Sequence, residues 1–378
     1  MNSNSKTNQA APDFPKLMDQ FAVLGDFVST ARHGSGHIND TYKVTCDLAG
    51  QPVHYLLQRI NHTIFKDPAA LMENIQRVTA HLRAKLRAAG CTDLSRQALT
   101  VIPTRAGGAV LRDDAGQWWR TYLFIERACT FDKVETEQQV FEAARAFANF
   151  QGLLADLPAP RLHDTIPHFH NAVLRLAALR DAIREDPHGR AAGAAAELAF
   201  VEQRAVQCAR LLDRHQRGEL PERITHNDTK LNNVMLDEQT NAAVCVIDLD
   251  TVMPGLALYD FGDMVRTATA AALEDERDLA KVFSRPEMFA ALARGYLSAA
   301  GFLTTAEREE LVFSGRLITL VIGIRFLTDH LLGDVYFKIH RPGHNLDRCR
   351  TQFKMVASLE SQAEAMEKVV AVTFKQHC

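Results

Sequence analysis

Two oxygen-bearing side chains in the second half of the chain have the types and spacing that phosphoryl transfer requires. They lie in the segment ITHNDTKLNNVM, where His226 is followed by Asp228 and then, five positions later, by Asn233. Transfer of a phosphoryl group from a nucleotide needs a carboxylate that orients the attacking hydroxyl and accepts its proton. It also needs an oxygen ligand for the metal that bridges the phosphates. Asp228 and Asn233 supply both groups in a loop that we expect between short strands.

A third oxygen ligand, Asp248, ends an apolar run fifteen residues beyond Asn233. The segment Asp237–Ala242 (DEQTNA) is typical of a hairpin turn, so we expect two short strands that return Asp248 beside Asn233. Carboxylate and amide oxygens suit Mg²⁺, which is a hard cation. An ordinary Asn-rich loop is the alternative interpretation, but the joint pattern favours a catalytic metal site.

Asp260 lies in the segment YDFGD, which looks like the metal-binding triplet of protein kinases but follows Asn233 by 27 residues. This separation is too long for the hairpin, so we do not expect Asp260 to bind the metal. Two interpretations stay open. Asp260 either braces the catalytic loop by accepting hydrogen bonds from backbone N–H groups, or caps a helix that begins near Phe261.

A glycine-rich segment, HGSGHIN, lies between two expected strands near the N-terminus. Gly34 and Gly36 would let the backbone N–H groups around Ser35 approach a phosphate closely, although a plain hairpin turn is the alternative. His37 and Asn39 follow this loop, which must reach the reacting centre. We therefore expect both side chains to contact the acceptor.

The order of expected elements predicts an α+β fold. Strand-like segments dominate the first third, ending with QWWRTYLFI, and helical patterns dominate the remainder apart from a β-rich patch over residues 223–250. We expect a flexible tail over residues 1–15, a small β-rich N-terminal lobe over residues 16–125, and a larger, mostly helical lobe over residues 126–378 that carries the catalytic β-hairpin. A ligand cleft would lie between the lobes.

Composition excludes several classes of protein. The chain has 378 residues, 47% of them hydrophobic and 24% charged, and its net charge is 43 − 46 = −3, which gives no electrostatic footprint for nucleic-acid binding. Its seven cysteines are scattered without a CxxC pair, as in a reduced cytoplasmic protein. The polar N-terminus lacks the apolar core of a secretory signal, and the longest apolar run is too short to span a membrane.

The HxDxxxxN segment followed by an Asp-ending strand resembles the aminoglycoside phosphotransferase and choline kinase superfamily, whose fold is protein-kinase-like. Further segments resemble the bacterial N-acetylhexosamine 1-kinases, among them GSGHINDTY, YLLQRINHTIFKD, VIDLDTVMPGLALYDFGDMVR and LITLVIGIRFLTDHLLGDVYFKIHRPGHNLDRCR. The resemblance runs from about residue 20 to about residue 360. It implies a kinase that uses ATP and Mg²⁺ to phosphorylate the anomeric C1 hydroxyl of N-acetylglucosamine or N-acetylgalactosamine. The products would be the sugar 1-phosphate and ADP.

The same resemblance implies a role for each matching position. Asp228 would be the catalytic base, and Asn233 and Asp248 would be the Mg²⁺ ligands. The positions implied for nucleotide binding are the glycine loop, one strand residue and the hinge that pairs with adenine: Gly34, Ser35, Gly36, Gln58, Phe124, Ile125 and Glu126. The positions implied for sugar binding, besides Asp228, His37 and Asn39, are Arg325 and Tyr336.

Gln58 departs from the general kinase pattern. It stands on the third strand where a lysine normally reaches the nucleotide phosphates, and alternation along the strand points the adjacent Arg59 to the opposite face. The sugar-kinase relatives share this glutamine. The cation on the phosphate side is therefore unassigned, and we expect Glu73 to lie on a solvated face of the following helix.

The acceptor is less strongly specified than the reaction. Choline and aminoglycosides are cationic and call for carboxylates or an aromatic cage, whereas both tryptophans lie in the N-terminal part and the C-terminal region is rich in basic residues. This favours a neutral or anionic polar acceptor. His168 and His170 either bind sugar hydroxyls or stabilise a turn.

Three alternative functions stay open. The first is a kinase for another hexose, an amino alcohol or a hydroxy-amino acid. The second is a non-catalytic module that binds nucleotide or sugar. A protein kinase is disfavoured, because Asp260 lies only twelve positions after Asp248, which leaves too few residues for an activation loop. We expect a monomer whose partners are a nucleotide and a small molecule.

Overall fold

The computed structural model describes residues 12–34 and 38–377, which form two compact units. The first unit comprises the described residues up to Ala80 together with Asp93–Glu126, and the second comprises His81–Thr92 together with the described residues from Arg127 onward. Of the tail expected over residues 1–15, only the last four residues are described, and helix α1 (Phe14–Asp19) begins within them.

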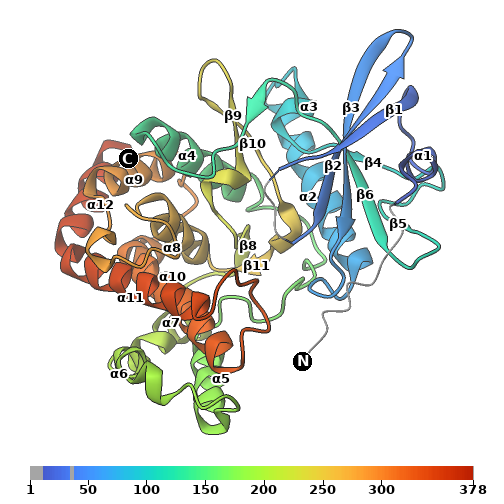
Figure 1. The fold of residues 1–378 in the computed structure, drawn as a ribbon. Helices are drawn as coiled ribbons and strands as arrows, with labels where there is room; N and C mark the ends of the chain where they lie inside the picture. The colour runs from blue at the N-terminus through green and yellow to red at the C-terminus, as the bar shows by residue number, and fades with distance from the viewer. Residues whose placement is uncertain (1–11, 35–37, 378) are drawn as a thin grey trace. The chain divides into compact units, whose positions relative to one another are not determined.

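The first unit is built around an antiparallel sheet (Figure 1). Its strands lie in the order β1-β2-β3-β6-β4, and β5 pairs with β6. The bounds are β1 (Asp26–Arg32), β2 (Asp40–Leu48), β3 (Gln51–Ile60), β4 (Val101–Ile102), β5 (Leu111–Arg112) and β6 (Trp118–Leu123). The turn between β2 and β3 consists of Ala49 and Gly50, both with positive φ (53° and 83°), which matches the twist of a two-residue hairpin.

The two faces of this sheet carry different residues because side chains alternate along a strand. One face is a hydrophobic core that includes Tyr55, Leu57 and Trp119 and packs on Leu17 and Met18 of α1. The opposite face carries polar side chains and contacts the helix α2 (Pro68–Ala88). A short helix, α3 (Leu94–Gln97), precedes β4.

Helices dominate the second unit, and two small sheets lie among them (Figure 1). The helices are α4 (Glu137–Leu153), α5 (Ala172–Glu185), α6 (Ala195–Glu202), α7 (Arg210–Gln216), α8 (Ala257–Ala268), α9 (Pro286–Leu297), α10 (Thr305–Leu331), α11 (His344–Ser361) and α12 (Ala363–His377). One sheet has the order β10-β9-β7 and the other pairs β11 with β8. Their bounds are β7 (Ala128–Cys129), β8 (Arg223–Thr225), β9 (Val234–Asp237), β10 (Ala243–Val246) and β11 (Met253–Gly255).

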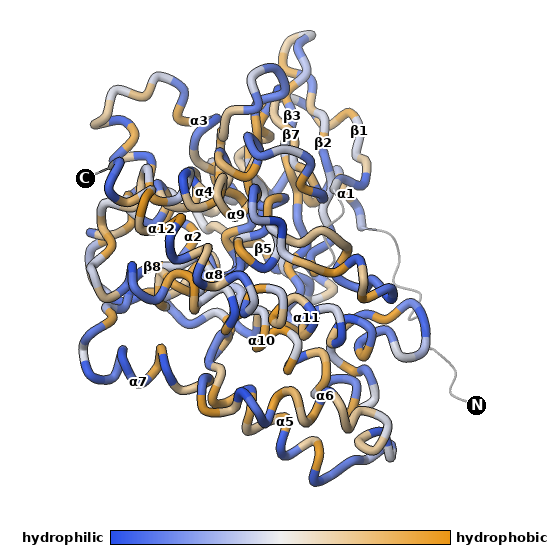
Figure 2. Tube along the Cα trace, turned by 90° about the vertical axis from the view of Figure 1, so that its left-hand side faces the viewer, coloured by the Kyte–Doolittle hydropathy of each residue, from blue (hydrophilic) through white to orange (hydrophobic). Residues whose placement is uncertain are grey.

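Helix α10 is the central helix of the second unit's core. It begins with a capping box in which Thr304 and Glu307 exchange hydrogen bonds, which satisfies two of the free N–H groups at its start. By length and composition it could cross a membrane, but 83% of its most apolar window is buried inside the protein. The peripheral helices α5 and α7 instead alternate between hydrophobic and hydrophilic residues (Figure 2), as helices with one exposed face do.

Helices α8 and α10 approach each other closely at Gly262. A Cβ atom built on Gly262 would lie 2.5 Å from the backbone oxygen of Ser314, so no larger residue fits without moving one helix. Helix α8 therefore has its position fixed against α10 at backbone contact distance.

We predict that Gly262→Ala lowers the free energy of unfolding by about 2–3 kcal/mol, as overpacking of a well-packed core does. Urea unfolding followed by circular dichroism measures this quantity. Gly301→Ala is the matched control, because a Cβ at Gly301 meets no atom within 4 Å among the described residues. Equal stability of the two variants would contradict the close approach of α8 and α10.

Candidate active site

The loop after β8 carries the His-x-Asp segment in an irregular backbone conformation. Asn227 has a φ of 65°, and His226 is fully buried. The His226 Nε2 atom lies 2.9 Å from the carbonyl oxygen of Ile247, and its ring meets Phe147 edge-on. His226 thus ties the loop to the end of β10 and packs it on α4.

Asp260 braces this loop from α8. Its carboxylate accepts hydrogen bonds from the backbone N–H groups of His226 (2.8 Å) and Asn227 (2.7 Å) and from the side-chain amide of Gln151 (2.7 Å). Burial raises the pKa of Asp260 to about 6, although these donors oppose the shift. Helix α8 starts earlier, with Leu256 at its N-cap position. Of the two interpretations of Asp260, the brace is the one observed and the helix cap is wrong.

Asp228 and Asn233 lie in direct contact. The Asn233 side-chain Nδ2 donates to the backbone oxygen of Asp228 at 2.7 Å and lies 3.1 Å from its Oδ2. Among the residues described, the Oδ1 atom of Asn233 accepts no hydrogen bond, so an amide oxygen is left for another partner. The orientation of this amide is thus fixed by the neighbouring carboxylate.

Lys230 is the functional candidate that the sequence interpretation missed. Its Nζ lies 3.0 Å from Oδ2 of Asp228. Burial opposes ionisation of Asp228, but the positive charge of Lys230 and smaller contributions outweigh it, so the pKa of this carboxyl is lowered. Conversely, the pKa of Lys230 is raised, first by Asp228 and to a smaller extent by Asp248 and Asp263. The sequence signal that could have identified Lys230 is its position two residues after Asp228.

The predicted hairpin is present and brings Asp248 next to Asn233. Strands β9 and β10 pair with Val246 opposite Val234, and the backbone N–H of Ile247 donates to the oxygen of Asn233 at 2.9 Å. Asp248 follows immediately, with φ 59° and ψ 56°. Strand pairing and a left-handed residue together turn this carboxylate out of the strand at the Asn233 end.

The donor set at the hairpin fits a hard divalent cation. It offers an amide oxygen from Asn233 and the carboxylate of Asp248, the ligand types that Mg²⁺ accepts together with water and phosphate oxygens. No group of three or more His, Cys, Asp or Glu side chains in the described parts of the chain could hold a metal.

Gln58, which we expect to contact the nucleotide, lies in a row of polar side chains across three strands of the first unit. Its amide nitrogen donates to Thr41 Oγ1 (3.0 Å), and its oxygen accepts from Nε of Arg120 (2.9 Å). Arg120 is buried and lies in register with Gln58 on β6. Sequence reasoning missed Arg120, because the pairing of β3 with β6 cannot be deduced from local spacing.

The expected hinge follows β6. The N–H of Phe124 donates to the backbone oxygen of His54 (3.1 Å), and Oε1 of Glu126 lies 2.5 Å from Nδ1 of the same histidine. Ile125 is buried. Within the described residues, the peptide groups of Ile125 and Glu126 make no backbone hydrogen bond, so this short segment has an unpaired backbone edge.

The glycine loop is described only at its ends. Gly34 has a φ of 76°, a conformation that favours glycine, while Ser35, Gly36 and His37 lie outside the described residues. Asn39 Oδ1 accepts a hydrogen bond from the N–H of Asn61 at 2.9 Å. This oxygen of Asn39 therefore fastens the start of β2 to the residue after β3.

Arg325 and Tyr336 lie together in the second unit. The Arg325 guanidinium lies 5.0–5.6 Å from the ring centres of Phe169, Tyr336 and Phe337, and its Nη2 is 3.5 Å from Tyr336 Oη. Burial lowers the pKa of Arg325, and the charge of Asp228 is among the smaller influences that oppose the shift. The two predicted acceptor residues thus form one cluster within electrostatic reach of Asp228.

His170 holds the loop after β8 rather than an exposed turn. It is buried, and its Nε2 lies 2.9 Å from the carbonyl oxygen of Asn227. Because a carbonyl only accepts, Nε2 must carry the proton. Burial lowers the pKa of His170 to about 4, so the ring is neutral in the folded protein at neutral pH.

Comparison with known proteins identifies the family. A model of the phosphotransferase enzyme family matches residues 29–309, more than half of the chain, and the chain belongs to this family. The α+β fold with protein-kinase-like relatives is confirmed, and so is the superfamily that the sequence resembles.

Solved structures with this fold include three kinases or phosphotransferases of small molecules. A microcompartment-associated aminopropanol kinase is 17% identical with a TM-score of 0.55, over 94% of this chain and 98% of that one. An aminoglycoside phosphotransferase from Alicyclobacillus acidocaldarius is 14% identical with a TM-score of 0.57, over 98% of both chains. Amicoumacin kinase in complex with AMP-PNP and Ca²⁺ is 12% identical with a TM-score of 0.56, over 88% of this chain and 90% of that one. At such identities the likeness shows the fold alone.

We predict that His170 makes stability depend on pH. Its pKa when folded (about 4) lies below the unfolded value of about 6.5, so the unfolded chain takes up a proton first as the pH falls. The stabilisation is complete above pH 6.5 and is lost on the way to pH 4. Between pH 7 and pH 5 the wild type should lose about 2 kcal/mol more than His170→Gln, measured by urea unfolding.

His170→Gln is chosen because its amide nitrogen can still donate to the carbonyl of Asn227. Other titrating groups are common to both proteins and cancel in the difference. An identical pH dependence of the two proteins would show that His170 is not buried in its neutral form.

Proposed function

We propose that the protein is an ATP- and Mg²⁺-dependent kinase that phosphorylates the anomeric C1 hydroxyl of an N-acetylhexosamine, N-acetylglucosamine or N-acetylgalactosamine. The observation that carries the proposal is the convergence of Asp228, Lys230, Asn233 and Asp248 at one end of the hairpin, on a loop held by Asp260. A chain that only bound nucleotide would have no chemical need for this full set.

In the proposed reaction, the acceptor hydroxyl lies against the Asp228 carboxylate. The C1 oxygen forms a bond to the γ-phosphorus as the bond from that phosphorus to the ADP oxygen breaks, and Asp228 takes the hydroxyl proton. The low pKa of Asp228 makes it a weak base, which suffices for two reasons. Phosphoryl transfer depends mainly on positioning and charge stabilisation, and an anomeric hydroxyl is more acidic than other sugar hydroxyls.

Asn233 and Asp248 are the proposed ligands of Mg²⁺, which when bound neutralises charge on the phosphates. Lys230 is the proposed cation beside the base, where it lowers the cost of bringing an anionic phosphoryl group to a carboxylate. The glycine loop, Gln58 with its partner Arg120, and the segment Phe124–Glu126 are proposed to bind the phosphates and the adenine.

The charge around Arg325 favours a neutral or anionic acceptor. In the described residues Arg325 has no carboxylate partner, and its hydrogen bond to Tyr336 is long. Two further arginines, Arg175 and Arg266, act on the same cluster. A cationic amine would be repelled here, and the aromatic rings already face a guanidinium. A carbonyl such as that of an N-acetyl group can accept from Arg325, with His37 and Asn39 as further proposed contacts.

The second candidate is an amino alcohol or aminoglycoside kinase, which the names of the structural neighbours favour. Phosphorus NMR with MgATP and a panel of acceptors separates the two functions. The panel contains both N-acetylhexosamines, plain hexoses, 1-amino-2-propanol, choline, homoserine and kanamycin. We expect a new sugar 1-phosphate resonance coupled to the anomeric proton. A product only with an amine acceptor would overturn the sugar assignment but keep the kinase.

We predict that Asp228→Asn lowers turnover by about 10²–10⁴-fold, the usual contribution of a positioned base, while the fold is retained. Initial rates in a coupled ADP-release assay measure this, with circular dichroism as a check of folding. Asp213→Asn, on an exposed position of α7, is the control and should keep wild-type turnover. Turnover of Asp228→Asn within threefold of wild type would rule out this base.

A further inference from the structure

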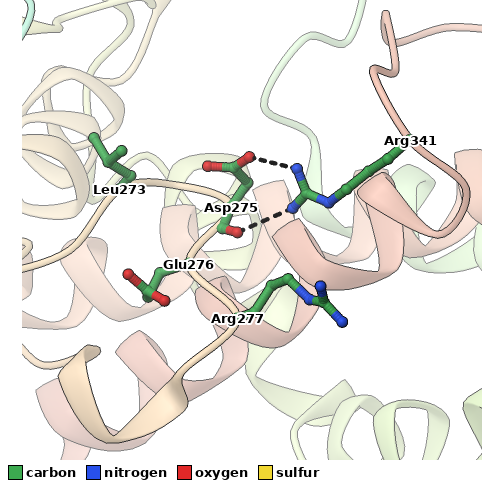
Figure 3. A pocket seen from close by; sticks show the side chains of 5 residues that line it. All are labelled: Leu273, Asp275, Glu276, Arg277 and Arg341. Atoms are coloured by element: carbon green, nitrogen blue, oxygen red, sulfur yellow. Dashed lines mark hydrogen bonds and ion pairs between the residues drawn. The ribbon is translucent and has the colours of Figure 1, made fainter.

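The segment Gly333–Gly343 joins α10 to α11 and is called here the acceptor loop, because it carries Tyr336. Two carboxylates fix it, one near each end. Asp329, in the last turn of α10, binds the part that contains Tyr336. Asp275, on the segment after α8, binds the opposite end through Arg341 (Figure 3).

Asp329 holds three successive backbone amides of the acceptor loop. Its Oδ1 accepts from the N–H groups of Val335 (2.9 Å) and Tyr336 (2.8 Å), and its Oδ2 accepts from the N–H of Phe337 (3.0 Å). Asn345 of α11 donates to the same Oδ2 at 2.9 Å. Asp329 is 4% exposed, so these four donors replace the water that an ionised carboxylate needs.

This arrangement sets the positions of two aromatic rings relative to Arg325. Arg325 precedes Asp329 by four residues on α10, which places both on one face of the helix. The ring of Phe337 packs on Phe326 (4.6 Å between centroids) and on Tyr336 (4.8 Å). The guanidinium of Arg325 lies over both loop rings. The carboxylate of Asp329 therefore fixes the backbone whose side chains enclose Arg325, the cation proposed to bind the acceptor.

Asp275 makes a comparable set of contacts at the opposite end. Its Oδ2 lies 3.0 Å from Arg341 Nη1 and 2.9 Å from His344 Nε2, and its backbone oxygen accepts from Arg341 Nη2 (3.2 Å). Its side chain is 35% exposed, and such ion pairs contribute little because water competes for them. Among the described residues, none of its hydrogen bonds or ion pairs reaches Tyr336 or Phe337.

We propose that Asp329 is a positioning residue for acceptor recognition: it holds Tyr336 and Phe337 around Arg325 without touching the acceptor itself. This rests on the proposed function, which assigns Arg325 and Tyr336 to the acceptor. Loss of the carboxylate weakens acceptor binding and leaves nucleotide binding intact, because in the described part of the chain the Asp329 side chain bonds only to the acceptor loop and α11.

The test compares Asp329→Asn with the matched control Asp275→Asn in the full-length enzyme. An asparagine replaces one carboxylate oxygen with an NH₂ group, which cannot accept a hydrogen bond. Some of the backbone N–H groups that Asp329 holds therefore lose their partner. For Asp329→Asn we expect the acceptor KM to rise at least tenfold, while kcat changes less and the Kd for MgADP by calorimetry stays within twofold. For Asp275→Asn we expect an acceptor KM within threefold of wild type.

A double-mutant cycle with Tyr336→Ala separates positioning from general destabilisation. If Asp329 acts through the loop, Asp329→Asn raises the acceptor KM far less in the Tyr336→Ala background than in the wild type, because the effects of coupled sites are not additive. Equal effects in both backgrounds, or an acceptor KM of Asp329→Asn within threefold of wild type, overturn the proposal.

Hydrogen exchange of the wild type gives a test that needs no variant. The side chains of Val335 and Tyr336 are largely exposed (76% and 55% for the residues), yet their amides should exchange slowly because Asp329 accepts from them. Fast exchange at residues 335–337 overturns the proposal even if Asp329→Asn fails to fold. If Asp329→Asn is active and its acceptor KM is unchanged, only the proposed role of Asp329 is refuted. If the wild type is inactive with every N-acetylhexosamine, the proposed function is refuted, and the role of Asp329 with it.

Discussion

The loop proposed to carry the catalytic base depends on one buried carboxylate. Residues 226–230 leave β8 without regular hydrogen bonding, and Asn227 takes a left-handed conformation. Backbone N–H groups in such a buried segment are costly unless they find acceptors. Asp260 accepts from two of them in succession, its own backbone oxygen accepts from the Thr229 hydroxyl, and Asp263 one turn further accepts from the N–H of Thr229. The first turns of α8 thus act as a template for the loop that presents Asp228.

The residues that the sequence made predictable are those whose geometry is local. Asp228, Asn233 and Asp248 are joined by one hairpin, and a turn-forming segment of the right length between two short apolar runs indicates where its ends meet. The α+β order was predictable for the same reason, since periodicity is read over short windows. The bracing role of Asp260 could be proposed but not decided, because the alternative of a helix cap depends on where α8 begins.

What escaped prediction depends on contacts between distant segments. Arg120 reaches Gln58 because β6 pairs with β3, although two helices and two short strands lie between them in the sequence. Asp329 was indistinguishable from any acidic residue near a helix end, since its partners come from the following loop and from α11. The boundary expected between the N-terminal tail and the first lobe was also misplaced. Helix α1 begins inside the segment expected to be a tail, because Leu17 and Met18 cover the apolar face of the sheet.

Helices α8 and α10, which approach to backbone contact distance at Gly262, carry different parts of the proposed site. Helix α8 carries the carboxylates that hold the proposed catalytic loop, while α10 carries Arg325 and the anchor of the loop beside it. Under the proposed function, a change of acceptor therefore does not require a new catalytic loop. The interval from Gly333 to Gly343 begins and ends on glycines with positive φ, and between them Asp329 accepts hydrogen bonds from three backbone N–H groups. If this loop selects the acceptor as proposed, its exposed residues can be exchanged to change selectivity while the loop that carries Asp228 stays the same.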